Sequence, residues 1–321
     1  VFWVKPSVEF LEKYLKVNHY DVLVTTGPPH SLHLIGLNLK KKLPNLKWIA
    51  DFRDPWTEIS YYKHLKLTKI ADKKHRKLES EVFKNADITL ATSYTDAENF
   101  RKKGANAFCI TNGFDVDAST TLSMTEENSK TLPLSNSTTK FTLSYIGVLE
   151  QLRNPEILWE TLNDLVQENA DFKNDFQLKF VGRLDDKILQ KIESSALKNN
   201  LTNLGYQTHD VALKHMQDST VLLMTNFPQE SSKGIIPGKI FEYLATGKTI
   251  LSFGPKDADV EKILIETKAG KHFGYDEKEN LKKFILESYE NWKSGTLNQN
   301  AENIEQFSRK NLTQKLVDLM N

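Results

Sequence analysis

The chain of 321 residues carries 43 basic and 42 acidic side chains, a formal net charge of +1, which excludes nucleic-acid binding driven by overall positive charge. With 39% hydrophobic and 26% charged residues it can bury sizeable cores, and its length predicts two domains rather than a disordered chain. A single cysteine, Cys109, excludes an internal disulfide and a thiolate zinc cluster, as is typical of a reducing compartment.

Signals for membrane insertion or secretion are not evident in the sequence. No run approaches the roughly 18 apolar residues needed to cross a bilayer, and the opening residues lack the basic and then apolar layout of a signal peptide. We therefore predict a cytoplasmic protein. The chain begins with Val1 rather than Met, which suggests a fragment whose earlier residues are missing.

Short apolar runs alternate with helical stretches in the first third of the chain. The apolar runs, most of which end in a polar residue or a glycine, predict strands over 21–26, 46–50, 86–91 and 108–110. Apolar residues at helical spacing predict helices over 8–17, 32–42, 67–84 and 95–103. This alternation indicates a parallel sheet covered on both faces.

The same alternation starts again after position 140, with strands predicted over 141–146, 176–181, 221–224 and 249–253. Between the two series, 118–138 is a predicted linker, because eleven of the 22 residues from 118 to 139 are Ser or Thr and no strong period appears. We predict two doubly wound α/β domains, 1–138 and 139–295. A terminal helix within 296–321 would pack against either domain.

The segment 234–248 is the most informative part of the sequence. Pro237 suits a helix start, and Lys239 and Glu242 are three residues apart, hence neighbours near that start. The lysine and the helix dipole would meet a diphosphate there, while the carboxylate would accept hydrogen bonds from ribose hydroxyls. A solvent-exposed Lys/Glu pair is the competing interpretation. Neither G-x-G-x-x-G nor a Walker lysine motif occurs, which disfavours a nicotinamide enzyme and a P-loop ATPase.

This segment resembles the nucleotide-sugar motif of family 4 glycosyltransferases, which have the GT-B fold, and it contains the ending EYLATGKTIL. Further matches occur in order over 51–56, 86–93, 110–115, 145–147 and 180–183, so that the resemblance covers about residues 20–290. It implies two Rossmann-like domains facing a cleft, the first of them incomplete at its start. It also implies retaining, metal-independent hexosyl transfer from a nucleoside-diphosphate sugar to a hydroxyl acceptor, in cell-surface polysaccharide or glycolipid synthesis.

The resemblance also implies roles for individual residues on the donor side. Glu242 would bind the ribose hydroxyls, and the loop 231–238 would line the phosphates and the sugar. Gly234 stands where the family has the first of two glutamates, so Glu230 or backbone N–H groups would have to replace that contact. Gly147 and Arg153 would meet the diphosphate of the donor. Arg183 and Tyr206 would lie near its nucleobase.

On the acceptor side, Asp51, Arg53 and Asp54 follow a predicted strand at the place where many relatives have a His-Asp pair. Arg53 replaces that histidine. We also predict His30 as a substrate contact, with a structural or capping histidine as the alternative. A metal site shared by His30 and His33 would need a third ligand, which is not evident nearby.

Other patterns are weaker. The Asp-x-Asp pairs at 115–117 and 257–259 could hold a divalent ion on a diphosphate, but such short pairs often arise by chance, and we predict neither a metal nor a cofactor beyond the donor. From Lys63 to Lys77, seven basic residues stand against the single acid Asp72, interleaved with apolar residues. This stretch predicts a solvated helix or a peripheral contact with anionic lipid at the inner face of a membrane.

The expected partners are a nucleotide-sugar donor and a sugar or lipid-linked acceptor, with no nucleic acid. Two rival interpretations remain open at this stage. One is a nucleotide-sugar binding protein without transferase activity, which the replacements at Gly234 and Arg53 favour. The other is a sugar-nucleotide 2-epimerase on the same architecture.

Overall fold

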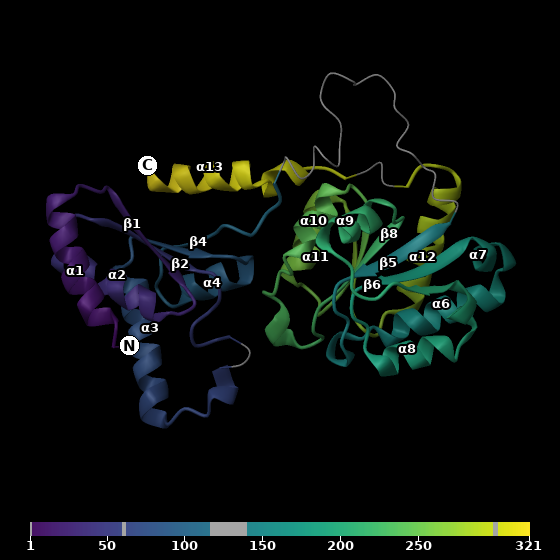
Figure 1. Cartoon of the computed structure of the whole chain (residues 1–321), viewed down its shortest axis with the longest axis horizontal. Coiled ribbons are helices and arrows are strands. Elements are labelled where there is room, and N and C mark those ends of the chain that lie inside the picture. Colours follow the sequence, from purple (N-terminus) through teal and green to yellow (C-terminus); the bar gives the residue numbers. More distant parts are fainter. Residues whose placement is uncertain (1, 60–61, 116–139, 298–300) are drawn as a thin grey trace, which may run out of the picture. The chain divides into compact units, whose positions relative to one another are not determined.

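The computed structural model describes residues 2–59, 62–115, 140–297 and 301–321. The chain divides into two compact units (Figure 1). Unit 1 runs to Thr111 and includes Met320, and unit 2 comprises Asn112–Leu319 and Asn321. The predicted linker, 118–138, lies outside the described residues. Every helix within the described ranges is too short or too polar to cross a bilayer.

Unit 1 is an α/β layer structure built on one parallel sheet. Its helices are α1 (Val4–Val17), α2 (Ser31–Lys42), α3 (Lys69–Asn85), α4 (Tyr94–Lys102) and the short 3-10 helix η1 (Tyr62–Leu65). Its strands are β1 (Val22–Gly27), β2 (Lys47–Phe52), β3 (Ile88–Ala91) and β4 (Ala107–Cys109), in the spatial order β1-β2-β3-β4. All neighbouring strands are parallel, as the alternation of strands and helices predicts.

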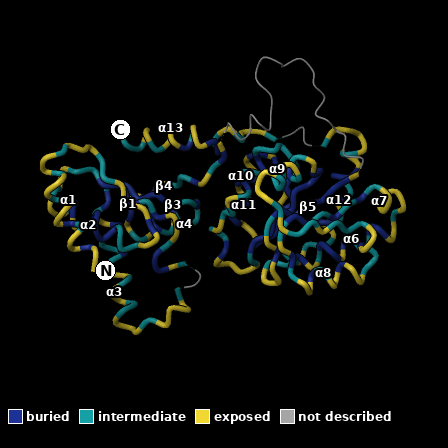
Figure 2. Tube along the Cα trace, viewed as in Figure 1, coloured by how far each residue is buried: buried dark blue, intermediate teal, exposed yellow. Residues whose placement is uncertain are grey.

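The core of unit 1 forms where the helices α1, α2, α3 and α4 pack around the sheet (Figure 2). Trp48 of β2 is fully buried, and its Nε1–H donates to Thr25 Oγ1 at 2.9 Å, so its one polar atom is satisfied. Gly36 of α2 faces the same ring, and a Cβ at this position would lie 2.4 Å from the indole. The helix can therefore approach β2 this closely only because position 36 lacks a side chain.

Unit 2 is a larger α/β structure on a second parallel sheet. Its strands are β5 (Phe141–Ile146), β6 (Phe176–Val181), β7 (Leu201–Asn203), β8 (Val221–Thr225), β9 (Thr249–Phe253) and β10 (Gly270–Phe273). Its α-helices are α6 (Glu156–Glu168), α7 (Ala170–Asp175), α8 (Asp186–Glu193), α9 (His209–Gln217), α10 (Lys239–Ala245), α11 (Asp259–Thr267), α12 (Lys278–Lys293) and α13 (Arg309–Met320). Its 3-10 helices are η3 (Gln151–Arg153), η4 (Ala196–Asn200), η5 (Glu230–Ser232) and η6 (Ile304–Phe307).

The strand order of unit 2 is β10-β9-β8-β5-β6-β7, with all pairs parallel. The chain first moves outward from β5 to β7 and then returns to the other side of β5. This reversal is the order of the doubly wound nucleotide-binding fold, in which ligands bind beyond the carboxyl ends of the strands at the point of reversal. In unit 2 that point lies between β5 and β8.

The sheet of unit 2 is covered on both faces, as predicted for a doubly wound domain. Helices α6, α8 and α12 lie on one side of it, and α9, α10 and α11 lie on the other (Figure 1). Every residue of the central strand β5 is buried, which explains why its sequence is a continuous apolar run with Thr142 and Ser144 as the only small polar members.

Candidate functional site

Three glycines follow three neighbouring strands of unit 2 in left-handed conformations. Gly147 follows β5 with φ +121°, Gly182 follows β6 with φ +125°, and Gly205 lies after β7 with φ +62°. A Cβ on Gly182 would lie 2.1 Å from the carbonyl oxygen of Gly147, whereas nothing stands within 4 Å of a Cβ on Gly147. The backbone at Gly147 is therefore open to close approach by a ligand.

The N–H groups of two of these glycines are already engaged. Gly147 N donates to the carbonyl of Val181 at 2.8 Å, and Gly182 N donates to that of Gly205 at 2.7 Å. These glycines thus provide space rather than free hydrogen-bond donors. Positive charge at this edge of the sheet must come from side chains.

Lys239, the first residue of α10, brings such a charge to the carboxyl end of β5. Its Nζ donates to the carbonyl of Ile146 at 3.3 Å and lies 3.9 Å from the centre of the Tyr145 ring. Burial of the ammonium, together with the nearby cation of Arg153 and only partly opposed by Glu242, lowers the pKa of Lys239 to about 7. No acidic side chain of the described ranges lies within ion-pair distance of this nitrogen. The solvent-exposed Lys/Glu pair considered above is not what the structure contains.

Arg153, in η3, is the second cation of this cluster. One guanidinium nitrogen donates to the carbonyl of Val148 at 3.0 Å and lies 3.4 Å from the Glu150 carboxylate. The guanidinium also lies over the Phe227 ring, 5.4 Å from its centre. Its Nε is buried without a hydrogen-bond partner in the described part of the chain. A buried donor of this kind costs free energy until it meets an acceptor.

Glu242 is half-buried in the first turn of α10, three residues after Lys239. The loop that leads into α10 is fixed by Asn226, which follows β8. Its side-chain amide donates to the carbonyl of Ile235 at 2.8 Å, and its own carbonyl accepts a hydrogen bond from the Tyr275 hydroxyl. The preorganised loop holds the lysine and the glutamate at the end of β8, beside the point where the strand order reverses.

The other donor-side residues predicted from the sequence lie at the same edge with less contact. Arg183 follows Gly182 and is exposed, and Tyr206 is 89% exposed. Gly234 lies in the loop before α10. Glu230, considered as a substitute for the missing glutamate, forms an ion pair with Lys233 at 2.8 Å and is largely exposed. Its carboxylate is therefore committed to a neighbouring side chain in this structure.

The acceptor-side residues lie at the carboxyl end of β2 in unit 1. Asp51 is half-buried and accepts a hydrogen bond from Thr26 Oγ1 of β1 at 2.8 Å. Burial raises the pKa of the Asp51 carboxyl, against the effects of Thr26 and of the nearby Arg53 guanidinium. Arg53 and Asp54 are exposed in the loop that follows. The structure places these three residues together, on unit 1.

His30 lies just before α2, and its side chain makes no capping hydrogen bond. Its ring stacks on Trp56 with centroids 5.3 Å apart and lies 5.9 Å from the ring of His33. Nδ1 of His30 and Nε2 of His33 are buried without partners among the described residues, and both approach Gly27. Burial, with a smaller effect from His30, lowers the pKa of His33 to about 3, so His33 is neutral at pH 7.

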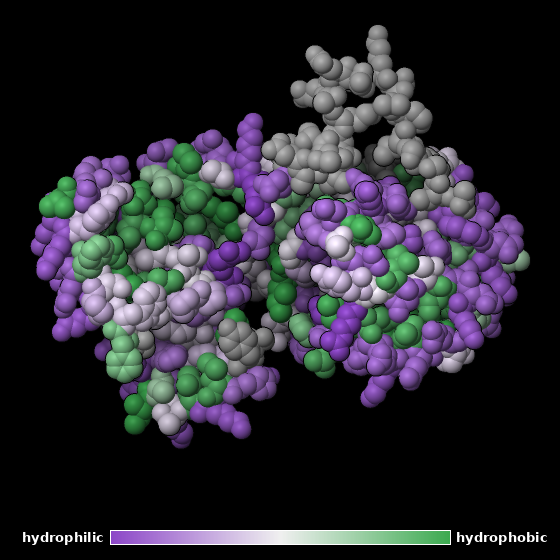
Figure 3. All heavy atoms as spheres, in the orientation of Figure 1, coloured by the Kyte–Doolittle hydropathy of each residue, from purple (hydrophilic) through white to green (hydrophobic). Residues whose placement is uncertain are grey.

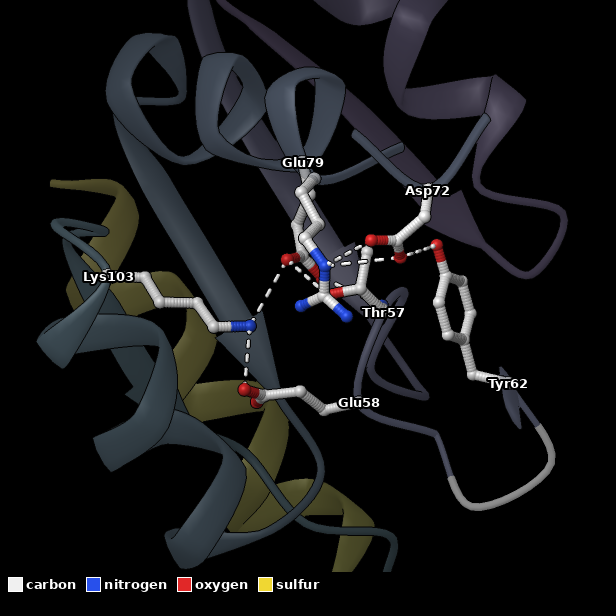
Figure 4. Close-up of polar contacts among 7 residues, drawn as sticks. Thr57, Glu58, Tyr62, Asp72, Glu79 and Lys103 are labelled. Carbon is white, nitrogen blue, oxygen red and sulfur yellow. Dashed lines mark hydrogen bonds and ion pairs between the residues drawn. The ribbon is translucent and has the colours of Figure 1, made fainter. Parts of the chain in front are cut away.

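A buried carboxylate in unit 1 was not found by sequence reasoning. Glu79 of α3 is 3% exposed and accepts hydrogen bonds from Thr57 N at 3.0 Å and Thr57 Oγ1 at 2.8 Å. Lys103 Nζ lies 3.1 Å from the same carboxylate and 3.0 Å from Glu58 (Figure 4). This network fixes the loop that carries Arg53 and Asp54. The residues of this network are far apart in the sequence, so no local spacing predicts it.

Within the described ranges, no three His, Cys, Asp or Glu side chains gather in a way that could hold a metal ion. Asp115 lies 3.4 Å from the guanidinium of Arg309, and the buried Asp259 pairs with Lys262 at 2.9 Å. Asp117, the second member of one predicted pair, lies outside the described residues.

No family model matches the sequence, and no functionally curated protein matches it. Solved structures do match. HepE of Anabaena, in complex with UDP, shares 16% identity over 98% of this chain and 80% of HepE, with a TM-score of 0.68. A glycosyltransferase of Rickettsia africae shares 14% identity over 99% of this chain and 81% of its own, with a TM-score of 0.62.

The sucrose-phosphate synthase of Thermosynechococcus elongatus shares 15% identity over 97% of this chain and 76% of its own, with a TM-score of 0.59. At these identities the shared property is the fold. The two parallel sheets with their covering helices are those of GT-B glycosyltransferases, as predicted.

Proposed function

We propose that this chain transfers a sugar from a nucleoside-diphosphate sugar to a hydroxyl acceptor, and that unit 2 binds the donor. One observation carries the proposal. The desolvated ammonium of Lys239 lies beside Arg153 at the strand-order reversal, with no acidic partner in the described ranges at ion-pair distance. A diphosphate would neutralise Lys239, share Arg153 with the Glu150 carboxylate, and supply the acceptor that Arg153 Nε lacks.

The roles follow from the charges that change during transfer. As the bond between the anomeric carbon and the diphosphate breaks, negative charge grows on the leaving oxygen, so Lys239 and Arg153 would stabilise the transition state more than the bound donor. Glu242 would accept hydrogen bonds from the ribose hydroxyls, and the open backbone at Gly147 would admit the phosphates. The two side-chain cations supply the charge that a metal ion supplies in other transferases.

The structural neighbours support a uridine nucleotide as the first donor to test. HepE was solved with UDP and with UDP-glucose, and both structures share the fold of this chain. The finer parts of the proposal rest on the sequence resemblance. These are membership of family 4, transfer of a hexose with retention of the anomeric configuration, and a place in cell-surface polysaccharide or glycolipid synthesis.

Unit 1 would contribute the acceptor side. Asp51 is the best-placed group for a hydroxyl, because its carboxylate is half-buried and oriented by Thr26. The raised pKa of Asp51 makes it a better base than an ordinary exposed aspartate. His30, the first residue before α2, would contact the substrate from the same edge of the sheet.

Calorimetric titration of the chain with UDP, uridine and inorganic diphosphate tests donor binding. We expect UDP to bind most tightly, diphosphate to bind measurably and uridine to bind weakly, because the cations carry most of the attraction. Equal affinity for UDP and uridine would overturn the proposal. Product analysis then separates the rivals: transfer of a labelled sugar to an acceptor supports the transferase, a mass-neutral change of UDP-GlcNAc indicates the epimerase, and binding alone indicates a binding protein. NMR of the product reports the anomeric configuration.

A further inference from the structure

A group of lysines without acidic partners among the described residues lies on the surface of unit 1. Six lysines of η1, of α3 and of the segment between them are exposed, and no ion pair or side-chain hydrogen bond joins any of them to another described residue: Lys63, Lys66, Lys69, Lys73, Lys74 and Lys77. The acid within this stretch, Asp72, is engaged by Arg76 at 3.0 Å and by the Tyr62 hydroxyl at 3.0 Å. The positive charge of this surface is therefore uncompensated.

The lysines of α3 share one side of the helix. At about 100° per residue, Lys69, Lys73, Lys74 and Lys77 fall within about 140° of one another. Ile70 lies within this arc and is 83% exposed. The buried residues of the helix, including Glu79 and Val82, lie on the opposite side. We call this arc of α3, together with η1 (Tyr62–Leu65) and Lys66, the basic face.

The basic face also carries exposed aliphatic side chains. Leu65 is 50% exposed and Ile70 is 83% exposed, each next to lysines along the chain. Figure 3 shows apolar side chains at the surface of unit 1 in the region where Figure 1 places the start of α3. Charged residues that surround exposed aliphatic ones are typical of helices lying in a membrane interface, where the lysines reach headgroups and the aliphatic residues enter the acyl boundary.

Hydrogen bonds tie η1 and the residues before it to α3. Tyr62 of η1 donates to Asp72 of α3, and Thr57, just before η1, is bonded twice by Glu79 of the same helix (Figure 4). The aliphatic residues are therefore presented without an ordering step, which lowers the entropy cost of binding a surface.

We propose that the basic face binds an anionic lipid bilayer. The lysines require a partner that carries negative charge, and the exposed Leu65 and Ile70 favour lipid over nucleic acid. Single-stranded nucleic acid is bound by stacking on aromatic rings, and Tyr62, the aromatic ring of the described part of this face, is half-buried with its hydroxyl bonded to Asp72. This inference does not depend on transferase activity.

Co-sedimentation with vesicles tests it. The wild-type chain should bind vesicles of equal parts phosphatidylglycerol and phosphatidylcholine, bind phosphatidylcholine vesicles weakly, and be released by salt. Replacing Lys69, Lys73 and Lys77 by glutamine should weaken binding about 100-fold, from about fivefold per lysine at the membrane surface. The matched control replaces Lys187, Lys198 and Lys214, exposed lysines of unit 2, and should leave binding nearly unchanged.

A second pair of variants separates insertion from charge. Ile70→Ser should weaken binding several-fold and leave its salt dependence intact, whereas Ile265→Ser, at a residue 71% exposed in α11, should have no effect. Thermal unfolding checks that all variants fold. The proposal is overturned if the two lysine triples behave alike, if Ile70→Ser binds like wild type, or if the basic face binds a single-stranded RNA but not vesicles.

Discussion

A desolvated charged side chain lies near the carboxyl edge of each sheet, Glu79 in unit 1 and Lys239 in unit 2, and the two have opposite kinds of neighbours. Glu79 of unit 1 is surrounded by donors: Thr57 gives it an N–H and a hydroxyl, and Lys103 gives it an ammonium. Lys239 of unit 2 has a carbonyl, an aromatic face and a second cation as neighbours, and the carboxylate of Glu242 lies near it but beyond ion-pair distance. The fold satisfies the charge of Glu79, and we propose that a ligand satisfies that of Lys239.

This difference predicts how each residue affects the stability of the free protein and the binding of a ligand. A buried charge with a full set of partners costs stability when it is removed, because its partners are left unpaired. A buried charge without an opposite charge weakens the free protein and strengthens binding of any ligand that supplies one. Deleting the two residues should therefore have opposite effects on stability, and only one deletion should affect the donor.

The largest effect is expected from Glu79→Ala. Removing the carboxylate leaves the N–H and the hydroxyl of Thr57 without their acceptor, while Lys103 keeps its ion pair with Glu58, so the free energy of unfolding of unit 1 should fall by about 2–4 kcal/mol. Urea unfolding followed by near-UV circular dichroism measures this. Glu79→Gln, which keeps one acceptor oxygen, should lose less. Affinity for UDP should stay at the wild-type value in either variant that folds, and a loss of UDP binding would contradict the separation of roles.

Lys239→Met should do the reverse. The thioether side chain fills a similar volume, and removing a desolvated cation should leave the melting temperature unchanged or raise it. UDP affinity should fall about 30- to 150-fold, the value of a charge-assisted interaction of about 2–3 kcal/mol. Titration calorimetry and thermal unfolding on the same samples give both numbers. A destabilised variant that still binds UDP would show that Lys239 is structural.

The depressed pKa of Lys239 predicts a pH dependence with a definite sign. Its pKa is about 7 in the free protein and about 10.4 when unfolded, so the penalty for its charge is full below pH 7 and is relieved as pH rises. The free energy of unfolding of wild type relative to Lys239→Met should therefore rise by about 1.4 kcal/mol per pH unit between pH 7 and 9. Because a diphosphate favours the protonated amine, UDP affinity should fall up to about tenfold per unit over the same range.

Proton uptake provides the check on this pH dependence. Calorimetry of UDP binding at pH 8 in buffers of different ionisation enthalpy should show uptake of close to one proton by wild type and none by Lys239→Met. The diphosphate itself does not change charge in this range, because phosphate groups of this type lose their last proton near pH 6. Equal uptake by both proteins would place the titrating group elsewhere.

Much of the fold could be predicted from sequence because its strands are buried on both sides. The apolar run 141–146 coincides with β5 (Phe141–Ile146), and 176–181 coincides with β6 (Phe176–Val181). The short strands β7 and β10 were not predicted. Thr202 of β7 and Lys271 and His272 of β10 interrupt the apolar pattern, and both strands lie at sheet edges, where pairing with a neighbour rather than hydrophobicity decides the conformation.

The candidate site was predictable only where it is local. Lys239 and Glu242 share one helix turn, and helical spacing is enough to pair them. The ring beneath Lys239 belongs to Tyr145, on a strand that adjoins α10 only in the folded unit. The same holds for Glu79, whose partners come from the loop after β2 and from the end of α4. Such long-range contacts leave no period in the sequence.

Glu242→Gln separates the role of Glu242 from that of Lys239 within unit 2. If the carboxylate accepts hydrogen bonds from ribose hydroxyls, UDP affinity should fall about tenfold, while affinity for inorganic diphosphate should not fall, since that ligand has no ribose. Lys239→Met should weaken both ligands alike. The ratio of the two affinities in each variant is the measurement. A Glu242 variant that weakens diphosphate as much as UDP would assign Glu242 to the phosphates or to folding.

The smallest effect on stability is expected from Asp51→Asn. Burial raises the pKa of Asp51, which means that the folded state disfavours the charged carboxylate relative to the unfolded state. At pH 7 a neutral side chain at this position should therefore raise the free energy of unfolding, by less than about 1 kcal/mol. Asn keeps an oxygen that can accept the hydrogen bond from Thr26, and its side chain has nearly the same volume as that of Asp. Sugar transfer should nevertheless fall strongly while UDP affinity is unchanged, because an amide cannot accept the acceptor's proton. Asp54→Asn, at an exposed position in the same loop, is the control. If both variants transfer sugar at the wild-type rate, the acceptor chemistry belongs to other residues of unit 1, and His30 is the next to test.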